Sequence, residues 1–276
     1  MILSFGPEVA GSAAQAWLIA VPTLVALCGY VAATFIAEGR TQVLRSTLLV
    51  AWLAHALAIV VDTAGVGAAP AGARFGFAPA LSVTVWLVLA VYGVESRYVP
   101  LAGVRRTLAV LAALTVVIAW AFPGELRPHA LSRWAPLHWV LGIASYGLFG
   151  AAVLHGAMLN RAEQQMRHRP GAAPSGMPLL RLERLTFRFV GAGFVVLSAA
   201  LLLGAWFASP WRWDHKTVFS MLGWVVFAAL LAGRRAFGWR GPHATRWLYG
   251  GAGLLLLAYV GSRFVVEVLL QRPAGN

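Results

Sequence analysis

Residues 189–208 read FVGAGFVVLSAALLLGAWFA, a run of 20 residues without a charged side chain. An apolar helix of about 20 residues rises about 1.5 Å per residue and so crosses a hydrocarbon core of roughly 30 Å. Of the 276 residues in the chain, 60% are hydrophobic and only 11% are charged, whereas soluble domains contain about 25% charged residues. The stretch therefore predicts an integral membrane protein.

Eight segments approach or reach this length, and together they predict an all-α, polytopic membrane protein with about eight transmembrane helices. They are residues 13–36, 46–67, 77–94, 107–122, 136–160, 189–208, 218–233 and 247–270. No basic region precedes the first segment, so we expect it to remain as a spanning helix rather than to be removed as a signal peptide. We expect a single membrane domain over residues 1–276.

One connection between these segments is predicted to be long and flexible. Residues 161–188 are polar and basic, and the sequence PGAAPSG occupies residues 170–176 at their centre. Proline and glycine at this density favour a flexible loop. The flanks 161–169 and 179–188 could instead extend the neighbouring helices.

The basic residues are distributed unequally between the two sides of the membrane. When the loops are counted alternately, 15 of the 22 Lys and Arg residues fall on one side. The positive-inside rule places this side in the cytoplasm and both termini outside, in the periplasm of a bacterial inner membrane. The net charge of +13 is then explained by contact with anionic membrane lipid, and we expect no nucleic-acid partner.

The loop before the seventh segment carries an unusual set of side chains. Its sequence, Trp211-Arg212-Trp213-Asp214-His215-Lys216, contains two indoles, a carboxylate, an imidazole and two cations. Indoles offer flat apolar contact, and cations pair with carboxylates. By the alternate counting of loops, this one lies on the outer side. The residues therefore suggest a site for a flat, anionic, metal-bearing ligand at the outer membrane surface.

Two of the seven histidines are candidates for metal ligation or transport. His138 begins the fifth segment at its outer end, and neutral imidazole is a common ligand of metals, including haem iron. His138 could equally be an interfacial histidine without a ligand. His55 lies near the middle of the second segment, and Asp62 follows two helical turns later on a similar face. His55 and Asp62 could line one polar track, or His55 could simply bond to a neighbouring helix.

Cys28 is the only cysteine, and it lies inside the first segment. The chain therefore contains no intrachain disulfide, no Cys-x-x-Cys redox pair and no Cys-x-x-Cys-His site for covalent haem attachment.

The loop and its surroundings resemble the cytochrome c assembly family of haem-handling membrane proteins (the CcsA, CcmC and CcmF type). Residues 207–217, FASPWRWDHKT, keep the later half of the family pattern Trp-Gly-x-x-Trp-x-Trp-Asp and lack its leading Trp-Gly. The segment headed by His138, with the pair Ser145-Tyr146, is similar to the family's histidine helix, and Trp224 falls where the family has a tryptophan in the next helix. The resemblance covers about residues 133–272, and the length is similar to that of short YpjD-type members.

The resemblance implies that haem is bound noncovalently at the outer face. His138 would be the first axial ligand, Trp211, Trp213 and Asp214 would form the cradle, and Trp224 would also bind the cofactor. The family's second outer histidine, after the loop, has no counterpart here, so His215 becomes a third candidate ligand as its substitute, and His55 resembles an earlier membrane histidine. The side and charge of Arg212, Lys216, Arg127 and Arg133 make them candidate partners of the haem propionates.

The function implied is to bind or present haem for the maturation of c-type cytochromes, together with maturation proteins and apocytochrome c. The chain would not be an enzyme, because no nucleophile and base stand at catalytic spacing. Two alternatives remain open. One is an ion or proton transporter, or its accessory, that uses His55 and Asp62. The other is a structural membrane partner that has lost haem binding.

Overall fold

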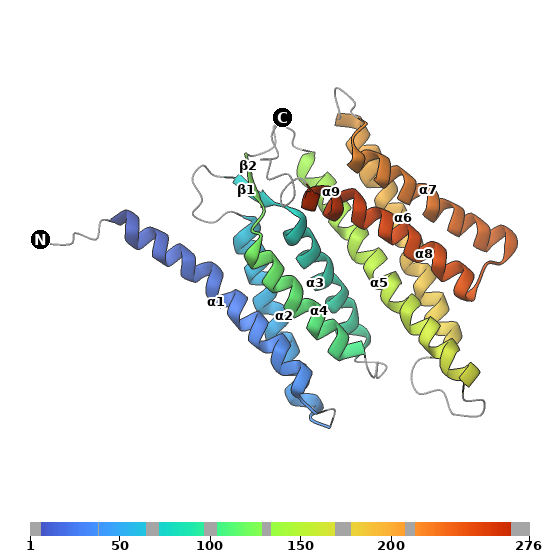
Figure 1. Ribbon diagram of the computed structural model, residues 1–276, viewed down its shortest axis with the longest axis horizontal. Helices are drawn as coiled ribbons and strands as arrows, with labels where there is room; N and C mark the ends of the chain where they lie inside the picture. The colour runs from blue at the N-terminus through green and yellow to red at the C-terminus, as the bar shows by residue number, and fades with distance from the viewer. Residues whose placement is uncertain are drawn as a thin grey trace, which may run out of the picture. The chain divides into compact units, whose positions relative to one another are not determined.

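The computed structural model describes residues 7–37, 39–64, 72–96, 104–128, 134–168, 178–207 and 213–265. Long helices dominate this part of the chain (Figure 1). They are α1 Pro7–Phe35, α2 Thr41–Thr63, α3 Phe77–Glu95, α4 Val104–Ala121, α5 Ala135–His168, α6 Leu179–Phe207, α7 His215–Phe237 and α8 Gly241–Leu256. A π-helical turn, η1 Leu257–Gly261, and the short α9 Ser262–Phe264 follow α8 directly.

Seven of these helices, α1 to α7, are long and apolar enough to cross a membrane. The eighth predicted segment corresponds to α8, η1 and α9, which run on without a break in the chain. Large apolar side chains on the helix surfaces remain exposed, such as Leu202 at 73% and Val195 at 67%, as expected for helices that face lipid. The predicted polytopic helical class is therefore confirmed, while the sidedness of the termini stays a prediction.

The predicted flexible loop at 161–188 is wrong in its extent. Residues 161–168 continue α5, and residues 179–188 form the first turns of α6. Glu, Gln, Arg and Leu in these flanks favour helix, and Leu182 and Thr186 are buried there. The helical alternative for the flanks is thus confirmed, and only residues 169–177 of the loop lie outside the described residues.

A two-stranded ribbon, which the sequence did not predict, accompanies the helices. Strand β1 (Gly72–Phe75) pairs antiparallel with β2 (Glu125–Pro128), with Ala73 opposite Arg127. Each strand has only four residues, too few to show an alternating hydrophobic pattern.

Contacts divide the chain into two compact units. Unit 1 comprises Met1–Trp86 and Gly103–Ala130, and unit 2 comprises Leu87–Ala102 and Leu131–Asn276. The boundary falls within α3, so this helix contributes residues to each unit. That the whole chain acts as one domain stays a prediction.

In unit 1, small and aromatic residues bring the helices together. A Cβ at Gly29 of α1 would lie 2.7 Å from the Cβ of Ala51 in α2, so the two backbones approach closely. Trp52 and Trp86 stack at 4.6 Å, and each indole N–H donates to the backbone carbonyl of the other tryptophan at 3.1 Å. These contacts join α1 to α2 and α2 to α3.

In unit 2, the core lies among α5, α6, α7 and α8 (Figure 1). The buried rings of Phe149 in α5 and Phe227 in α7 stack at 3.9 Å. Gly251 in α8 faces Phe227, because a Cβ added there would lie 2.8 Å from the ring. The missing side chain lets α8 approach α7, as small residues do in membrane helix pairs.

Candidate functional site

His138 lies in the first turn of α5, half-buried against α6. Its Nδ1 is 2.9 Å from the backbone oxygen of Ala200. A carbonyl oxygen can only accept, so Nδ1 carries the hydrogen and donates it. In a neutral ring of this tautomer the lone pair is on Nε2, which is the arrangement that a backbone carbonyl imposes on many metal-binding histidines.

The start of α7 is organised by Asp214. Its Oδ1 accepts a hydrogen bond of 2.7 Å from the backbone N–H of Thr217, so Asp214 is the N-cap of the helix. Partial burial acts to raise the pKa of this carboxyl. The hydrogen bonds from Thr217 and the nearby charge of Lys216 outweigh burial, so the pKa of Asp214 lies below its usual value. The carboxylate predicted as part of a haem cradle therefore also holds the helix end.

Trp213 and His215, on either side of Asp214, are exposed. The Trp213 side chain is 70% exposed, and His215 is the first residue of α7. An exposed indole beside a helix N-terminus offers an apolar surface next to a region that favours negative charge.

Lys216, in the first turn of α7, interacts electrostatically with His138. Its ammonium lies 5.4 Å from the centre of the Tyr259 ring in η1, and its positive charge acts on the His138 imidazole. The structure thus brings two predicted site residues, His138 and Lys216, within electrostatic reach of each other.

Tyr146, of the predicted Ser-Tyr pair, donates a hydrogen bond from its hydroxyl to the carbonyl of Leu255 in α8.

Trp224 lies deeper in α7 and joins it to α6. Its indole N–H donates to the hydroxyl of Ser198 at 2.8 Å, and its ring stacks on Phe194 at 5.3 Å. Trp224 packs against the core of unit 2. These contacts show that Trp224 supports the packing of α6 and α7. Its contact with a cofactor stays a prediction.

Part of the predicted site lies outside the described residues. This is the case for Trp211, Arg212 and Arg133. Arg127 belongs to β2 in unit 1. Among the described residues, no group of three or more His, Cys, Asp or Glu side chains could hold a metal ion.

His55 and Asp62 lie in unit 1 and line the same cavity of about 410 Å³. The ring of His55 is fully used in hydrogen bonding, with Nδ1 3.1 Å from the Tyr30 hydroxyl and Nε2 2.7 Å from the Ser82 hydroxyl. Asp62 pairs with Arg74 at 3.5 Å. The predicted sharing of one polar face is visible here, but His55 could bind a metal only after losing one of these two bonds.

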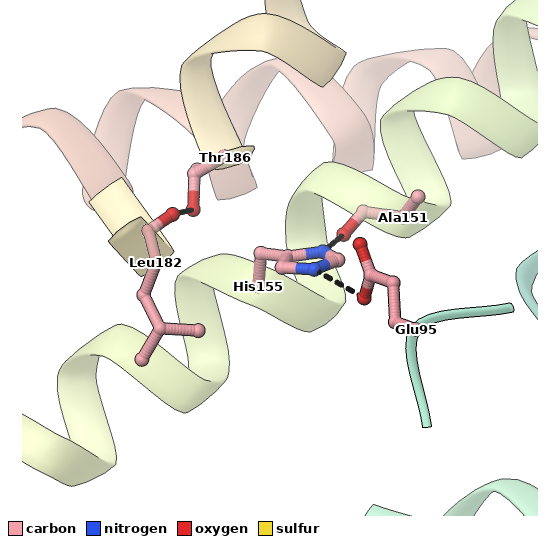
Figure 2. Close-up of polar contacts among 5 residues, drawn as sticks. All are labelled: Glu95, Ala151, His155, Leu182 and Thr186. Atoms are coloured by element: carbon pink, nitrogen blue, oxygen red, sulfur yellow. Dashed lines mark hydrogen bonds and ion pairs between the residues drawn. The ribbon is translucent and has the colours of Figure 1, made fainter. Parts of the chain in front are cut away.

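A buried polar pair that was not predicted from the sequence involves the middle part of α5 (Figure 2). His155 is fully buried, and its Nδ1 donates to the carbonyl of Ala151 at 2.7 Å. Its Nε2 lies 2.8 Å from Oε2 of Glu95 at the end of α3. Because Nδ1 is already a donor, one further proton is shared between Nε2 and the carboxyl group. An acidic residue placed directly after the apolar segment 77–94 was the available signal.

The chain is similar to proteins of cytochrome c biogenesis. Residues 17–270 match the sequence model of the family described as Cytochrome C assembly protein. Cytochrome c biogenesis protein CcsA of Synechococcus sp. (strain JA-3-3Ab) is 33% identical over 107 residues, which cover 35% of this chain and 31% of that protein. Inner membrane protein YpjD of Escherichia coli (strain K12) is 30% identical over 163 residues, which cover 57% of this chain and 62% of that protein.

The matches therefore cover about a third of this CcsA and less than two thirds of this YpjD. No solved structure matches the chain.

Proposed function

Because the chain belongs to the cytochrome c assembly protein family, as its tryptophan loop and histidine helix predicted, we propose that it binds haem noncovalently at the outer face of the membrane. The family match begins at residue 17, well before the resemblance expected over 133–272, so it also includes unit 1. The haem would be presented for maturation of c-type cytochromes.

The observation that supports haem binding most directly is the hydrogen bond from Nδ1 of His138 to the Ala200 carbonyl. This bond orients the ring and places its lone pair on Nε2, the atom that would bind the haem iron. The bound iron would supply the redox chemistry of haem. The residues of this chain would bind the ring and orient it.

The start of α7 supplies groups that fit the rest of a haem molecule. The exposed indole of Trp213, with Trp211 before it, offers apolar surface to the porphyrin. Lys216 and the arginines Arg212 and Arg133 provide positive charge for the propionates. Asp214 would hold the loop in place through its cap, and exposed His215 is the candidate for a second ligand of the iron.

On this proposal the protein lies in the bacterial inner membrane, as the name of the similar YpjD states for that protein. It would work with maturation proteins and apocytochrome c as a haem-binding partner rather than as an enzyme. The cytochrome thiols must come from another chain, because Cys28 is the only cysteine and lies within α1.

The test is haem binding by the purified protein in mild detergent, followed by the Soret absorption. We expect a near-stoichiometric Soret band in the wild type. In His138→Ala the haem affinity should fall at least tenfold, as it does when a metal ligand or the residue that orients it is removed. His168→Ala is the matched control, because His168 is an exposed histidine at the other end of the same helix. Equal binding by all three proteins would contradict ligation by His138. A wild type without a Soret band would contradict haem binding itself and favour a structural role for the protein.

A second function, movement of a proton or ion through unit 1, is supported by the cavity that His55 and Asp62 share. A neutral His55 has one N–H, so one of its two hydroxyl partners donates to the ring and the other accepts. In a relay through the ring, one hydroxyl would give its proton to one nitrogen while the other nitrogen gives its proton to the second hydroxyl. The first hydroxyl would then take up a proton from the far side of the relay, and the second would release its own. Proton uptake by proteoliposomes should then be lost in Asp62→Asn and kept in Asp214→Asn. Lack of uptake by the wild type would exclude this function.

A further inference from the structure

The imidazole ring of His138 occupies a place where α6 has no side chain. A Cβ added to Gly204 would lie 2.9 Å from Cε1 of His138, 3.2 Å from its Nδ1 and 3.7 Å from its Nε2. Apart from the local backbone of α6 itself, these three ring atoms are the nearest heavy atoms to that position. The space that Gly204 leaves is therefore filled by the histidine ring.

The backbone of α6 does not itself require glycine at this position. Gly204 lies within a regular α-helix, and the described glycines with positive φ are Gly238 and Gly241. Glycine weakens a helix relative to alanine because it loses more conformational freedom on folding. Its use at 204 therefore needs a packing reason.

Helix geometry provides that reason. The residue four positions after Ala200 is Gly204, and a helical side chain covers the turn that precedes its own Cα. A side chain at 204 would cover the carbonyl of Ala200, which accepts the hydrogen bond from Nδ1 of His138. Without a side chain, the carbonyl is open to the ring.

We propose that Gly204 is a positioning residue for the haem ligand His138. Its missing Cβ gives the ring access to the Ala200 carbonyl, and that hydrogen bond fixes the ring with Nε2 as the iron-binding atom. This inference rests on the haem-binding function proposed above. It predicts that one methyl group on α6 weakens haem binding through its effect on the ring of His138.

The first experiment compares Gly204→Ala with Gly191→Ala in a haem titration followed by the Soret band. Gly191 lies in the same helix, and a Cβ added there meets nothing within 4 Å. We expect Gly204→Ala to weaken haem binding about 10-fold to 100-fold, the usual effect of losing a partner that orients a metal ligand. Gly191→Ala should bind as the wild type does, and equal affinities in all three proteins would overturn the inference.

A double-mutant cycle separates positioning from a general packing defect. If Gly204 acts through His138, then Gly204→Ala should cause no further loss of haem affinity in a His138→Ala background. Independent effects would instead multiply, and that result would overturn the inference. The melting temperatures of the single variants show whether any loss of affinity follows a loss of stability.

A measurement without haem keeps the inference distinguishable from the proposed function. Nitrogen chemical shifts of ¹⁵N-labelled histidine should show His138 protonated at Nδ1 in the wild type and in Gly191→Ala. In Gly204→Ala the nitrogen shifts of His138 should differ from those of the wild type. Unchanged shifts in Gly204→Ala would overturn the positioning role even if the protein binds haem. A wild type with no haem affinity would overturn the proposed function. The chemical shifts would still decide whether Gly204 positions the imidazole ring of His138.

Discussion

Asp214 shows how one residue can serve both a local and a functional requirement. The resemblance to the cytochrome c assembly family implied that Asp214 forms part of a haem cradle. The structure shows that its Oδ1 caps α7 through Thr217. A carboxylate at a helix N-terminus is also favoured by the helix dipole. Loss of haem binding on mutation of Asp214 would therefore not prove direct contact with haem.

We predict that Asp214→Ala lowers the free energy of unfolding by about 0.5–2 kcal/mol, because one N–H of the first turn of α7 loses its acceptor. Asp214→Asn should lose less, since asparagine caps helices nearly as well. The measurement is denaturant unfolding in detergent at neutral pH. Equal stability of Asp214→Ala and the wild type would contradict the capping role.

The same residue predicts a pH dependence. The pKa of Asp214 is lowered in the folded protein, so its stabilising contribution is present above the unfolded pKa and is lost as the pH falls through the folded value. The stability advantage of the wild type over Asp214→Asn should therefore shrink on acidification. An advantage that grows at low pH would show that the carboxylate is not stabilised in the fold.

At the level of elements, close contacts between helices depend on a few glycines. A Cβ at Gly251 of α8 would lie 2.8 Å from the ring of Phe227, which is fully buried and stacked on Phe149. The neighbouring Gly250 meets nothing within 4 Å. Two adjacent glycines in one helix are therefore expected to respond differently to the same substitution.

We predict that Gly251→Ala destabilises the protein by about 1–3 kcal/mol, the usual cost of overpacking a core. Gly250→Ala should be neutral or slightly stabilising, because alanine favours helix. Thermal unfolding of both variants in detergent, followed by circular dichroism, checks this. A larger loss in Gly250→Ala would mean that α8 does not pack on α7 in the described register.

For the whole molecule, the prediction concerns orientation. Alternate counting of loops puts Phe122, at the end of α4, outside and His168, at the end of α5, in the cytoplasm. Both residues are exposed, and Cys28 is the only native cysteine. In a Cys28→Ala background, Phe122→Cys should react with a membrane-impermeant maleimide on cells with a permeabilised outer membrane. His168→Cys should react only after the inner membrane is also opened, and the reverse pattern would invert the topology.

Much of the architecture could be predicted because a bilayer imposes simple requirements. Backbone polar groups in hydrocarbon must be bonded within the segment, so each apolar run of sufficient length becomes a helix. The end of α5 and the start of α6 were harder to predict. Residues 161–168 and 179–188 are polar enough to suggest a loop, yet they form helix where Leu182 and Thr186 are buried.

The sequence by itself determined the membrane class, the number of helical segments and the family, since these depend on composition, length and residue order. Only the tertiary structure decided which histidines have partners and of what kind. The carbonyl of Ala200 lies 62 positions after His138, and Glu95 lies 60 positions before His155. The space beside Gly204 likewise exists only once α5 packs on α6. Such pairings follow from which helix faces meet, and that is fixed by side-chain packing across the whole unit rather than by any local pattern.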